Sequence, residues 1–173
     1  MDLGLQGRAV IVTGGSSGIG AAIARAYGAE GADVAVAYHQ NRDAAEAVAA
    51  DAAKGGGRTV SIHHELADPA SAANLAAAVL AEFGRIDVLV NNAVNWGSAA
   101  PNFNRRSEDV PAEEWLPVVR HNIEGTVHAT RAVTLTPAGR LNTPEDVAAS
   151  VLFLGSAANT AITGEAIKAS GGR

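Results

Sequence analysis

The stretch Arg8-Ala-Val-Ile-Val-Thr-Gly-Gly-Ser-Ser-Gly-Ile-Gly20 decides the fold. Its first part, Arg8 to Val12, is a short apolar run that ends in glycines, which is typical of a strand buried on both faces of a parallel sheet. Residues 19–28 then carry apolar side chains at helical spacing. The glycines therefore lie between a strand and a helix, where they allow a tight turn.

A loop in this position predicts a phosphate site. Glycines let a pyrophosphate approach the backbone, and the helix N-terminus offers unpaired N–H groups and a positive partial charge. We interpret residues 13–20 as a dinucleotide-binding loop. The alternative is a glycine-rich turn that holds no ligand. The loop lacks the Gly-Lys-Ser or Gly-Lys-Thr ending that is typical of nucleoside-triphosphate sites.

The alternation of strand and helix continues along the chain. Further strands are expected at Ala32 to Tyr38, Thr59 to Leu66 and Ile86 to Asn91, with helices at Asp43 to Lys54 and at Pro69 to about Gly84. Asp68 is a good N-cap for the second of these helices. Regular alternation of this kind predicts an α/β fold, a Rossmann-like doubly wound parallel sheet with helices on both faces.

The second half of the chain is less regular. Asn95 to Val110 has no clear period and is expected to form a long surface loop. A helix is expected from Glu113 to about Val133, although Pro117 would break its hydrogen-bond ladder unless this proline lies in the first turn. Thr143 is expected to cap a helix that ends near Gly155, and residues 166–169 are a candidate last strand.

Composition bounds the class of protein. The chain has 173 residues, 47% of them hydrophobic, a net charge of −5 and no cysteine. This length favours a single domain, residues 1–173, and the hydrophobic fraction suffices for a buried core. Scattered basic residues argue against nucleic acid, and no apolar run is long enough to cross a membrane. Without cysteine there is no disulfide or thiolate metal site, and a cytoplasmic location is expected.

The spacing of the glycines resembles that of one family. Three residues separate Gly14 from Gly18, and Ile19-Gly20 follow, a form similar to the glycine motif of short-chain dehydrogenases/reductases. Similar motifs are Asn91-Asn92-Ala93, Trp115 with Asn122, Pro137-Ala138-Gly139-Arg140, Thr143 to Ala148, and Ile162-Thr163-Gly164-Glu165 leading to Gly171-Gly172. The likeness is greatest to bacterial 3-oxoacyl-[acyl-carrier-protein] reductases and glucose dehydrogenases. It implies hydride transfer between a nicotinamide cofactor and a carbonyl or alcohol substrate, by a homo-oligomer.

The end of the second expected strand favours NADP over NAD. A carboxylate there would accept the ribose hydroxyl of NAD, but the sequence reads Tyr38-His39-Gln40-Asn41-Arg42. Arg42 and His39 could meet the extra phosphate of NADP. The alternative is that both are solvated loop residues.

The resemblance also implies that Glu65 and Leu66 hold the adenine, although the family's usual acid there is Asp. Val94 stands where the family has Gly after Ala93. The candidate cofactor-binding residues are Gly14, Ser16, Ser17, Gly18, Ile19, Gly20, Tyr38, His39, Arg42, Glu65, Leu66, Asn92 and Ala93.

Most of the family's catalytic residues are absent from this sequence. The resemblance implies a Ser, a Tyr, a Lys four residues after the Tyr, and an Asn, of which only Asn122 is present. Tyr27 and Tyr38 are not followed by such a Lys. A block of roughly 60–80 residues, two strand-and-helix units, is lacking between about Val133 and Pro137.

These observations leave two hypotheses. The chain is an NADP(H)-dependent oxidoreductase whose catalytic segment is missing, through deletion or because residues are omitted from the sequence. The alternative is a catalytically inactive family remnant that binds a dinucleotide or a partner. His63, His64, His121 and His128 do not have the spacing of a metal site, and we interpret them as structural or surface residues.

Overall fold

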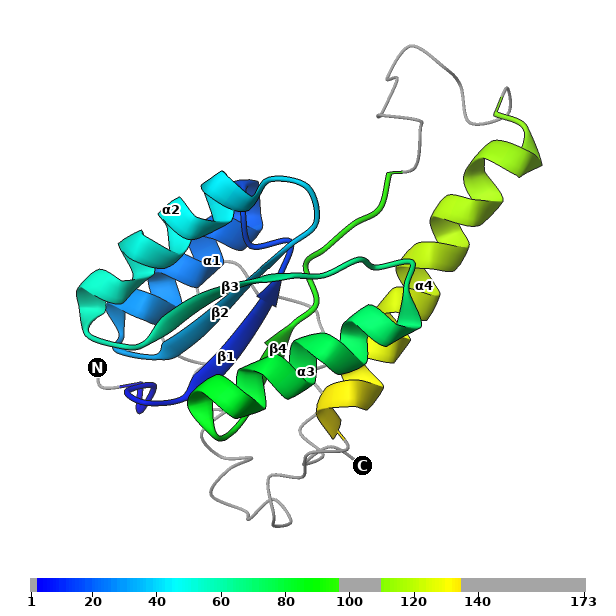
Figure 1. Ribbon diagram of the computed structural model, residues 1–173. Coiled ribbons are helices and arrows are strands. Elements are labelled where there is room, and N and C mark those ends of the chain that lie inside the picture. The colour runs from blue at the N-terminus through cyan, green and yellow to red at the C-terminus, as the bar shows by residue number, and fades with distance from the viewer. Residues whose placement is uncertain (1–2, 97–109, 135–173) are drawn as a thin grey trace, which may run out of the picture. The chain divides into compact units, whose positions relative to one another are not determined.

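The computed structural model describes residues 3–96 and 110–134 (Figure 1). The chain divides into two compact units, residues 1–136 and residues 137–173, and every described element belongs to the first. The expected helix from Thr143, the strand at residues 166–169 and most of the expected loop after Asn95 lie outside the described residues. Whether the whole chain forms one domain stays a prediction.

Four parallel strands form the sheet. They are β1 (Ala9–Thr13), β2 (Asp33–Tyr38), β3 (Thr59–His63) and β4 (Val88–Val90), in the order β3-β2-β1-β4. In the register of the central strands, Ile11 lies between Ala35 and Leu89. The chain thus moves outward from β1 to β3 and then returns to place β4 on the other side of β1. This reversal is the place where ligands bind in open α/β sheets.

Helices follow each strand. They are α1 (Gly18–Ala29), α2 (Arg42–Ala52) with the short 3₁₀ turn η1 (Ala53–Gly55), α3 (Pro69–Phe83) and α4 (Ala112–Thr134). Local sequence explains several of their ends. The side chain of Asn41 accepts a hydrogen bond from Ala44 N at the start of α2, and that of Asp68 accepts one from Ala70 N at the start of α3. Gly84 ends α3 in the left-handed conformation.

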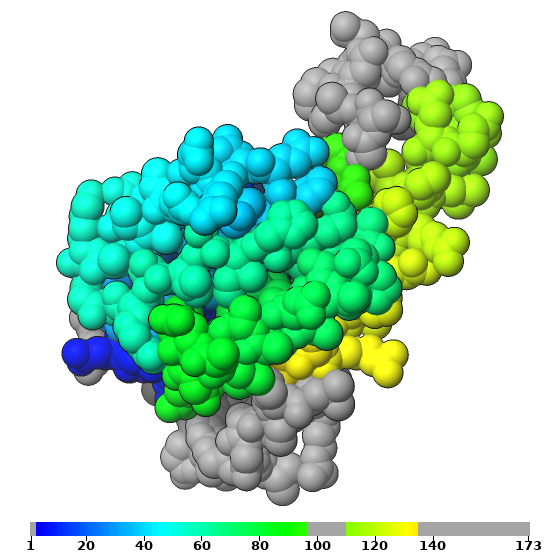
Figure 2. All heavy atoms as spheres, viewed as in Figure 1, coloured from blue at the N-terminus to red at the C-terminus, as the bar shows by residue number. Residues whose placement is uncertain are grey.

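The sheet is covered on both faces, as the sequence predicts. Val10, Val12, Val34 and Val36 point to one face and pack against α1 and α2. Alternate residues of the same strands, including Ile11 and Ala35, point to the other face and pack against Leu75, Val79 and Phe83 of α3. Helix α4 lies beside α3, and the atoms of the two helices adjoin in Figure 2. The predicted Rossmann-like α/β fold is confirmed.

Pro117 lies inside α4, beyond its first turn. It was expected to break the hydrogen-bond ladder in any position after the first turn, and α4 starts at Ala112 and continues through Pro117. The missing N–H of Pro117 leaves the carbonyl of Glu113 without its helical partner. Because Glu113 is exposed, water can bind that carbonyl. Within the described ranges, none of the helices combines the length and hydrophobicity that a bilayer span requires.

Candidate cofactor site

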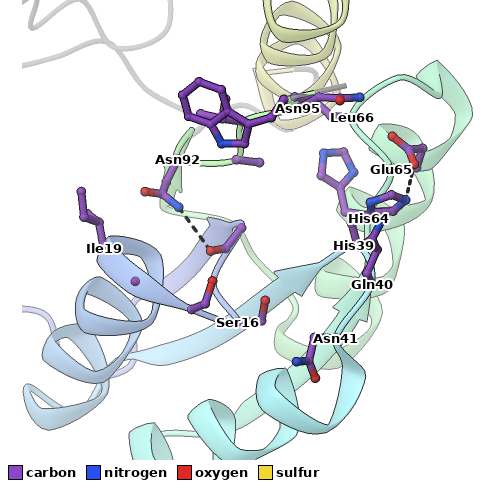
Figure 3. A pocket seen from close by; sticks show the side chains of 16 residues that line it. Ser16, Ile19, His39, Gln40, Asn41, His64, Glu65, Leu66, Asn92 and Asn95 are labelled. Carbon is purple, nitrogen blue, oxygen red and sulfur yellow. Dashed lines mark hydrogen bonds and ion pairs between the residues drawn. The ribbon is translucent and has the colours of Figure 1, made fainter. Parts of the chain in front are cut away.

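A cavity of about 670 Å³ opens at the carboxyl ends of the strands (Figure 3). Segments that follow all four strands contribute to its wall. The lining residues are Gly14, Ser16, Ser17, Gly18, Ile19, His39, Gln40, Asn41, His64, Glu65, Leu66, Asn92, Ala93, Val94, Asn95 and Trp96. The structure therefore brings together every candidate cofactor-binding residue except Gly20, Tyr38 and Arg42. Among these lining residues there is neither lysine nor arginine.

The glycine loop leaves room above the start of α1. Gly14 has φ +63, and a Cβ there would lie 3.0 Å from Cα of Ala93. Gly18 has φ +52, and a Cβ there would meet nothing within 4 Å. Gly14 thus permits close packing of the loop on the end of β4, whereas Gly18 faces open space. An anion could approach the backbone at Gly18.

The N-terminus of α1 has the features of an anion site. Ser17 is the N-cap, but its side chain makes no capping hydrogen bond, and the first turn contains no acidic residue. The first N–H groups of a helix have no partner within the helix, and they carry positive partial charge. Because Ser16 to Ile19 line the cavity, these groups are available to a phosphate there. Backbone groups therefore supply the positive potential that the lining side chains lack.

Thr13 and Asn92 connect the glycine loop to the segment that follows β4. Thr13 Oγ1 accepts hydrogen bonds from the backbone N–H groups of Asn92 and Ala93, both at 3.0 Å, and donates to Val90 O at 3.0 Å. Asn92 Nδ2 donates to Thr13 O at 3.0 Å and to Gly14 O at 3.3 Å. The side-chain amide of Asn92 therefore holds the loop. The sequence placed Thr13 in the loop, residues 13–20, but did not predict that its hydroxyl binds the segment after β4.

His39 and Glu65 meet across the ends of β2 and β3. His39 Nε2 is paired with Glu65 Oε2, and Glu65 Oε1 accepts a hydrogen bond from Ala67 N at 3.0 Å (Figure 3). Glu65, which was expected to hold the adenine, and His39, which was expected to meet the extra phosphate of NADP, thus already have partners in the protein. His39 must exchange this partner before it can bind a phosphate.

Arg42 and Tyr38 flank the lining segment His39 to Asn41 and are not themselves among the lining residues. Arg42 is the first residue of α2, and its Nε donates to Glu46 Oε1 at 2.7 Å. Its side chain is 73% exposed, so a change of rotamer would meet little resistance. The ring of Tyr38 packs edge-on against that of His63.

His64 stands in the cavity wall, although it was interpreted as a structural or surface residue. It is only 4% exposed. Its Nδ1 lies 3.4 Å from Ser71 Oγ, and its Nε2 is buried without a hydrogen-bond partner among the described residues. Burial lowers the pKa of His64, which outweighs the opposing effect of Glu65. The imidazole is therefore neutral at pH 7.

Asn122 joins α4 to the segment that follows β4. Its Oδ1 accepts from Asn95 N at 2.8 Å, and its Nδ2 donates to Asn95 O at 2.8 Å and to Val118 O at 2.7 Å. Both donor positions of the amide are occupied. In this arrangement Asn122 positions the cavity wall at Asn95 and has no hydrogen left for a substrate.

Comparison with known proteins identifies relatives of this chain. Residues 8–159 match the profile of the family described as short chain dehydrogenase. D-threitol dehydrogenase of Mycolicibacterium smegmatis is 41% identical over 132 residues, which cover 76% of this chain and 48% of that protein. The 3-oxoacyl-[acyl-carrier-protein] reductase of Synechocystis is 36% identical over 130 residues, 75% of this chain and 50% of that protein. The chain spans about half the length of the curated relatives it matches.

Solved structures show the same fold. A short chain dehydrogenase from Burkholderia cenocepacia in complex with NADP matches with a TM-score of 0.66 and 35% identity, over 76% of this chain and 51% of that one. An NAD⁺-bound xylitol dehydrogenase matches with a TM-score of 0.66 and 29% identity, over 76% of this chain and 48% of that one. Proteins similar to this chain thus include both an NADP complex and an NAD⁺ complex.

Proposed function

Because this chain belongs to the short-chain dehydrogenase family, we propose that it binds NADP(H) in the cavity at the carboxyl ends of its strands, as an oxidoreductase of carbonyl or alcohol substrates. The observation that carries the proposal is the uncapped N-terminus of α1 beside the open space at Gly18. That geometry suits a ligand whose phosphate oxygens can accept hydrogen bonds from backbone N–H groups.

The order of the strands suggests which residues hold each part of the cofactor. The pyrophosphate would lie at Ser16 to Ile19 after β1, and the adenosine would extend over the ends of β2 and β3. The nicotinamide half would lie toward Asn92 to Asn95 after β4. When bound, the nicotinamide supplies or accepts the hydride. The residues of this chain bind and orient: Thr13 and Asn92 hold the loop, and Asn122 holds Asn95.

NADP is the preferred cofactor in this proposal. The segment that directly follows β2, residues 39–42, contains no carboxylate to repel a 2′-phosphate, and the Glu65 carboxylate that reaches this segment is paired with His39. Asp33 is at the opposite end of β2 and binds Arg58. Arg42 is close along the chain to Asn41, which lines the cavity. When Arg42 exchanges Glu46 for a phosphate, one charge-assisted pair replaces another, and the new partner carries more negative charge.

Titration with NADPH and NADH tests this preference. We expect NADPH to bind about tenfold or more tightly, since a hydrogen bond to a charged group contributes about 1.5–3 kcal/mol. Arg42→Ala should remove most of that difference, whereas Glu46→Gln should increase it because Arg42 is released. Arg25→Ala is the matched control, since Arg25 is also exposed and paired, with Asp51. Equal affinities for the two cofactors in the wild-type protein would contradict the preference.

A second candidate function rests on the sequence itself. The chain contains no Tyr followed four residues later by Lys, and Asn122 has both amide hydrogens engaged. A family member without a general acid could bind the dinucleotide and transfer no hydride. Intact mass measured on the natural protein separates the two functions. A mass several kilodaltons above 17.5 kDa would favour the enzyme, and a match to 17.5 kDa would favour the binding protein.

A further inference from the structure

His64 has an unused hydrogen-bonding atom in the cavity wall. Its Nε2 is buried and has no partner in the described part of the chain, yet the residue lines the cavity. In Figure 3 the ring stands on the side of the cavity where His39 and Glu65 meet. Buried polar atoms are nearly always hydrogen-bonded. Because Nε2 itself is closed to solvent, the ring must shift toward the cavity before this atom can meet a group of a bound ligand.

The neighbours of His64 favour one tautomer of its ring. Ser71 Oγ accepts a hydrogen bond from Glu65 N at 2.8 Å and lies 3.4 Å from His64 Nδ1. With one lone pair of Oγ already used, the Ser71 hydroxyl is suited to donate to Nδ1. A neutral imidazole that accepts at Nδ1 carries its hydrogen on Nε2. In this tautomer Nε2–H is a donor and needs an acceptor.

The position of His64 in the sheet indicates which part of the cofactor lies closest. β3 is the outermost strand, two strands away from the phosphate loop that follows β1. An adenosine that extends from that loop across β2 reaches the end of β3 with its base. Leu66, which is buried and also lines the cavity, offers apolar contact to a flat base. Purine ring nitrogens are hydrogen-bond acceptors.

We propose that His64 donates a hydrogen bond from Nε2 to a ring nitrogen of the adenine, and that it is a specificity-determining residue for the base. The inference rests on the proposed function, since it requires the dinucleotide to bind in this cavity. The inference assigns recognition of the base to His64, whose Nε2 has no hydrogen-bond partner among the described residues. Both carboxylate oxygens of Glu65, by contrast, already have partners, His39 and Ala67 N.

Variants of His64 test this role with two probes, each representing half of the cofactor. The probes are 2′,5′-ADP, which contains the adenine, and nicotinamide mononucleotide, which does not. His64→Leu should weaken NADPH and 2′,5′-ADP by about tenfold, the effect of one lost hydrogen bond, and leave nicotinamide mononucleotide unchanged. His64→Gln, which keeps an N–H donor, should recover part of the affinity. His63→Leu is the control, because His63 is the exposed neighbouring histidine.

Nitrogen-detected NMR of the wild-type imidazoles gives a second readout that does not depend on a variant. The His64 signals should show protonated Nε2 and should shift when 2′,5′-ADP is added, but not when nicotinamide mononucleotide is added. A folded His64→Leu protein with wild-type affinity for 2′,5′-ADP, or unshifted His64 signals at saturation, would overturn the inference while the proposed function stands. Failure of the wild-type protein to bind NADPH would overturn both.

Discussion

At the scale of single residues, Asp87 gathers hydrogen bonds at the start of β4. Its carboxylate accepts from Ala9 N at 2.9 Å, from Arg8 Nη1 at 3.0 Å and from Arg85 Nη2 at 2.5 Å. Burial acts to raise the pKa of Asp87, but the hydrogen bonds from Arg85, Ala9 and Arg8 outweigh it and the pKa is lowered. The charged form therefore stabilises the folded protein above the ordinary pKa of an aspartate.

Asp87→Asn should lower the free energy of unfolding by about 1–2 kcal/mol at pH 7, because hydrogen bonds to a charged acceptor become neutral ones. The wild-type protein should lose the same stabilisation as the pH falls from about 4, the unfolded value, through the lowered folded pKa. The difference in the free energy of unfolding between wild type and Asp87→Asn should therefore shrink at acidic pH, as measured by urea denaturation at pH 7 and pH 3.

Asp51→Asn is the control. The pKa of Asp51 is lowered by Lys54 and Arg25, but that network is exposed and should contribute little. A difference that persists unchanged at pH 3 would refute the linkage.

Some single-residue roles could be predicted from the sequence and others could not. Gly14 and Gly18 were predictable because tight loops between a strand and a helix require their conformations, and both have positive φ. The roles of Thr13 and His64 depend on groups far along the chain or around a turn, Asn92 and Ser71 respectively. The pairing of Arg42 with Glu46, four residues away on α2, was visible in principle from helical spacing.

At the scale of elements, local signals predicted the ends of helices better than the ends of strands. Asp68, Pro69 and Gly84 bound α3 where the sequence predicts, because capping acts within one turn. β3 and β4 are shorter than the apolar runs from which they were predicted, ending at His63 and Val90. Strand ends depend on where the neighbouring strand stops, and that partner is distant in sequence.

Gly125 determines how closely α4 approaches the rest of the described unit. It is buried, and a Cβ added to it would overlap Cγ and the backbone oxygen of Leu66. Gly125→Ala should therefore destabilise the protein by about 1–3 kcal/mol, the cost of overpacking, although alanine is the better helix former. Because Leu66 lines the cavity, NADPH affinity should fall as well. Urea denaturation and calorimetric titration measure the two effects. The neighbouring exposed variant Glu124→Ala should change neither, and a Gly125→Ala protein as stable as wild type would contradict the packing.

At the scale of the whole molecule, strand order rather than any one motif creates the cavity. β1 pairs with β2 on one side and β4 on the other. Helix α1, which follows β1, covers one face of the sheet. Helices α3 and α4 lie on the other face. The alternation of strands and helices predicted a parallel sheet with both faces covered. Coverage of both faces requires the chain to return past β1, but the alternation did not predict after which strand it returns.

The exposed face of α4 is relevant to assembly, which stays a prediction. It carries large apolar side chains between 42% and 61% exposed, namely Trp115, Leu116, Val119, Ile123 and Val127. Apolar stripes of this kind favour association. We expect sedimentation to show self-association that Ile123→Lys reduces; a wild-type protein that stays monomeric at high concentration would contradict this.

A protein with only these 173 residues should bind NADPH and yet fail to reduce carbonyl substrates at the rate of its family. The cavity, the loop and the α1 N-terminus are contained in residues 3–96, so binding does not need the missing block. Turnover needs the missing block, because a positioned general acid contributes about 10²–10⁴ in rate. Asn122 does not replace that acid, since its amide hydrogens are engaged with Asn95 and Val118. The loss of substrate positioning lowers the rate further, although such losses are not additive.

The turnover rate is measured from the absorbance of NADPH in the presence of ketones and 3-oxoacyl thioesters, on a sample whose mass has been confirmed. Turnover of about one per second or faster, as in ordinary enzymes, would mean that another residue or a second chain supplies the proton.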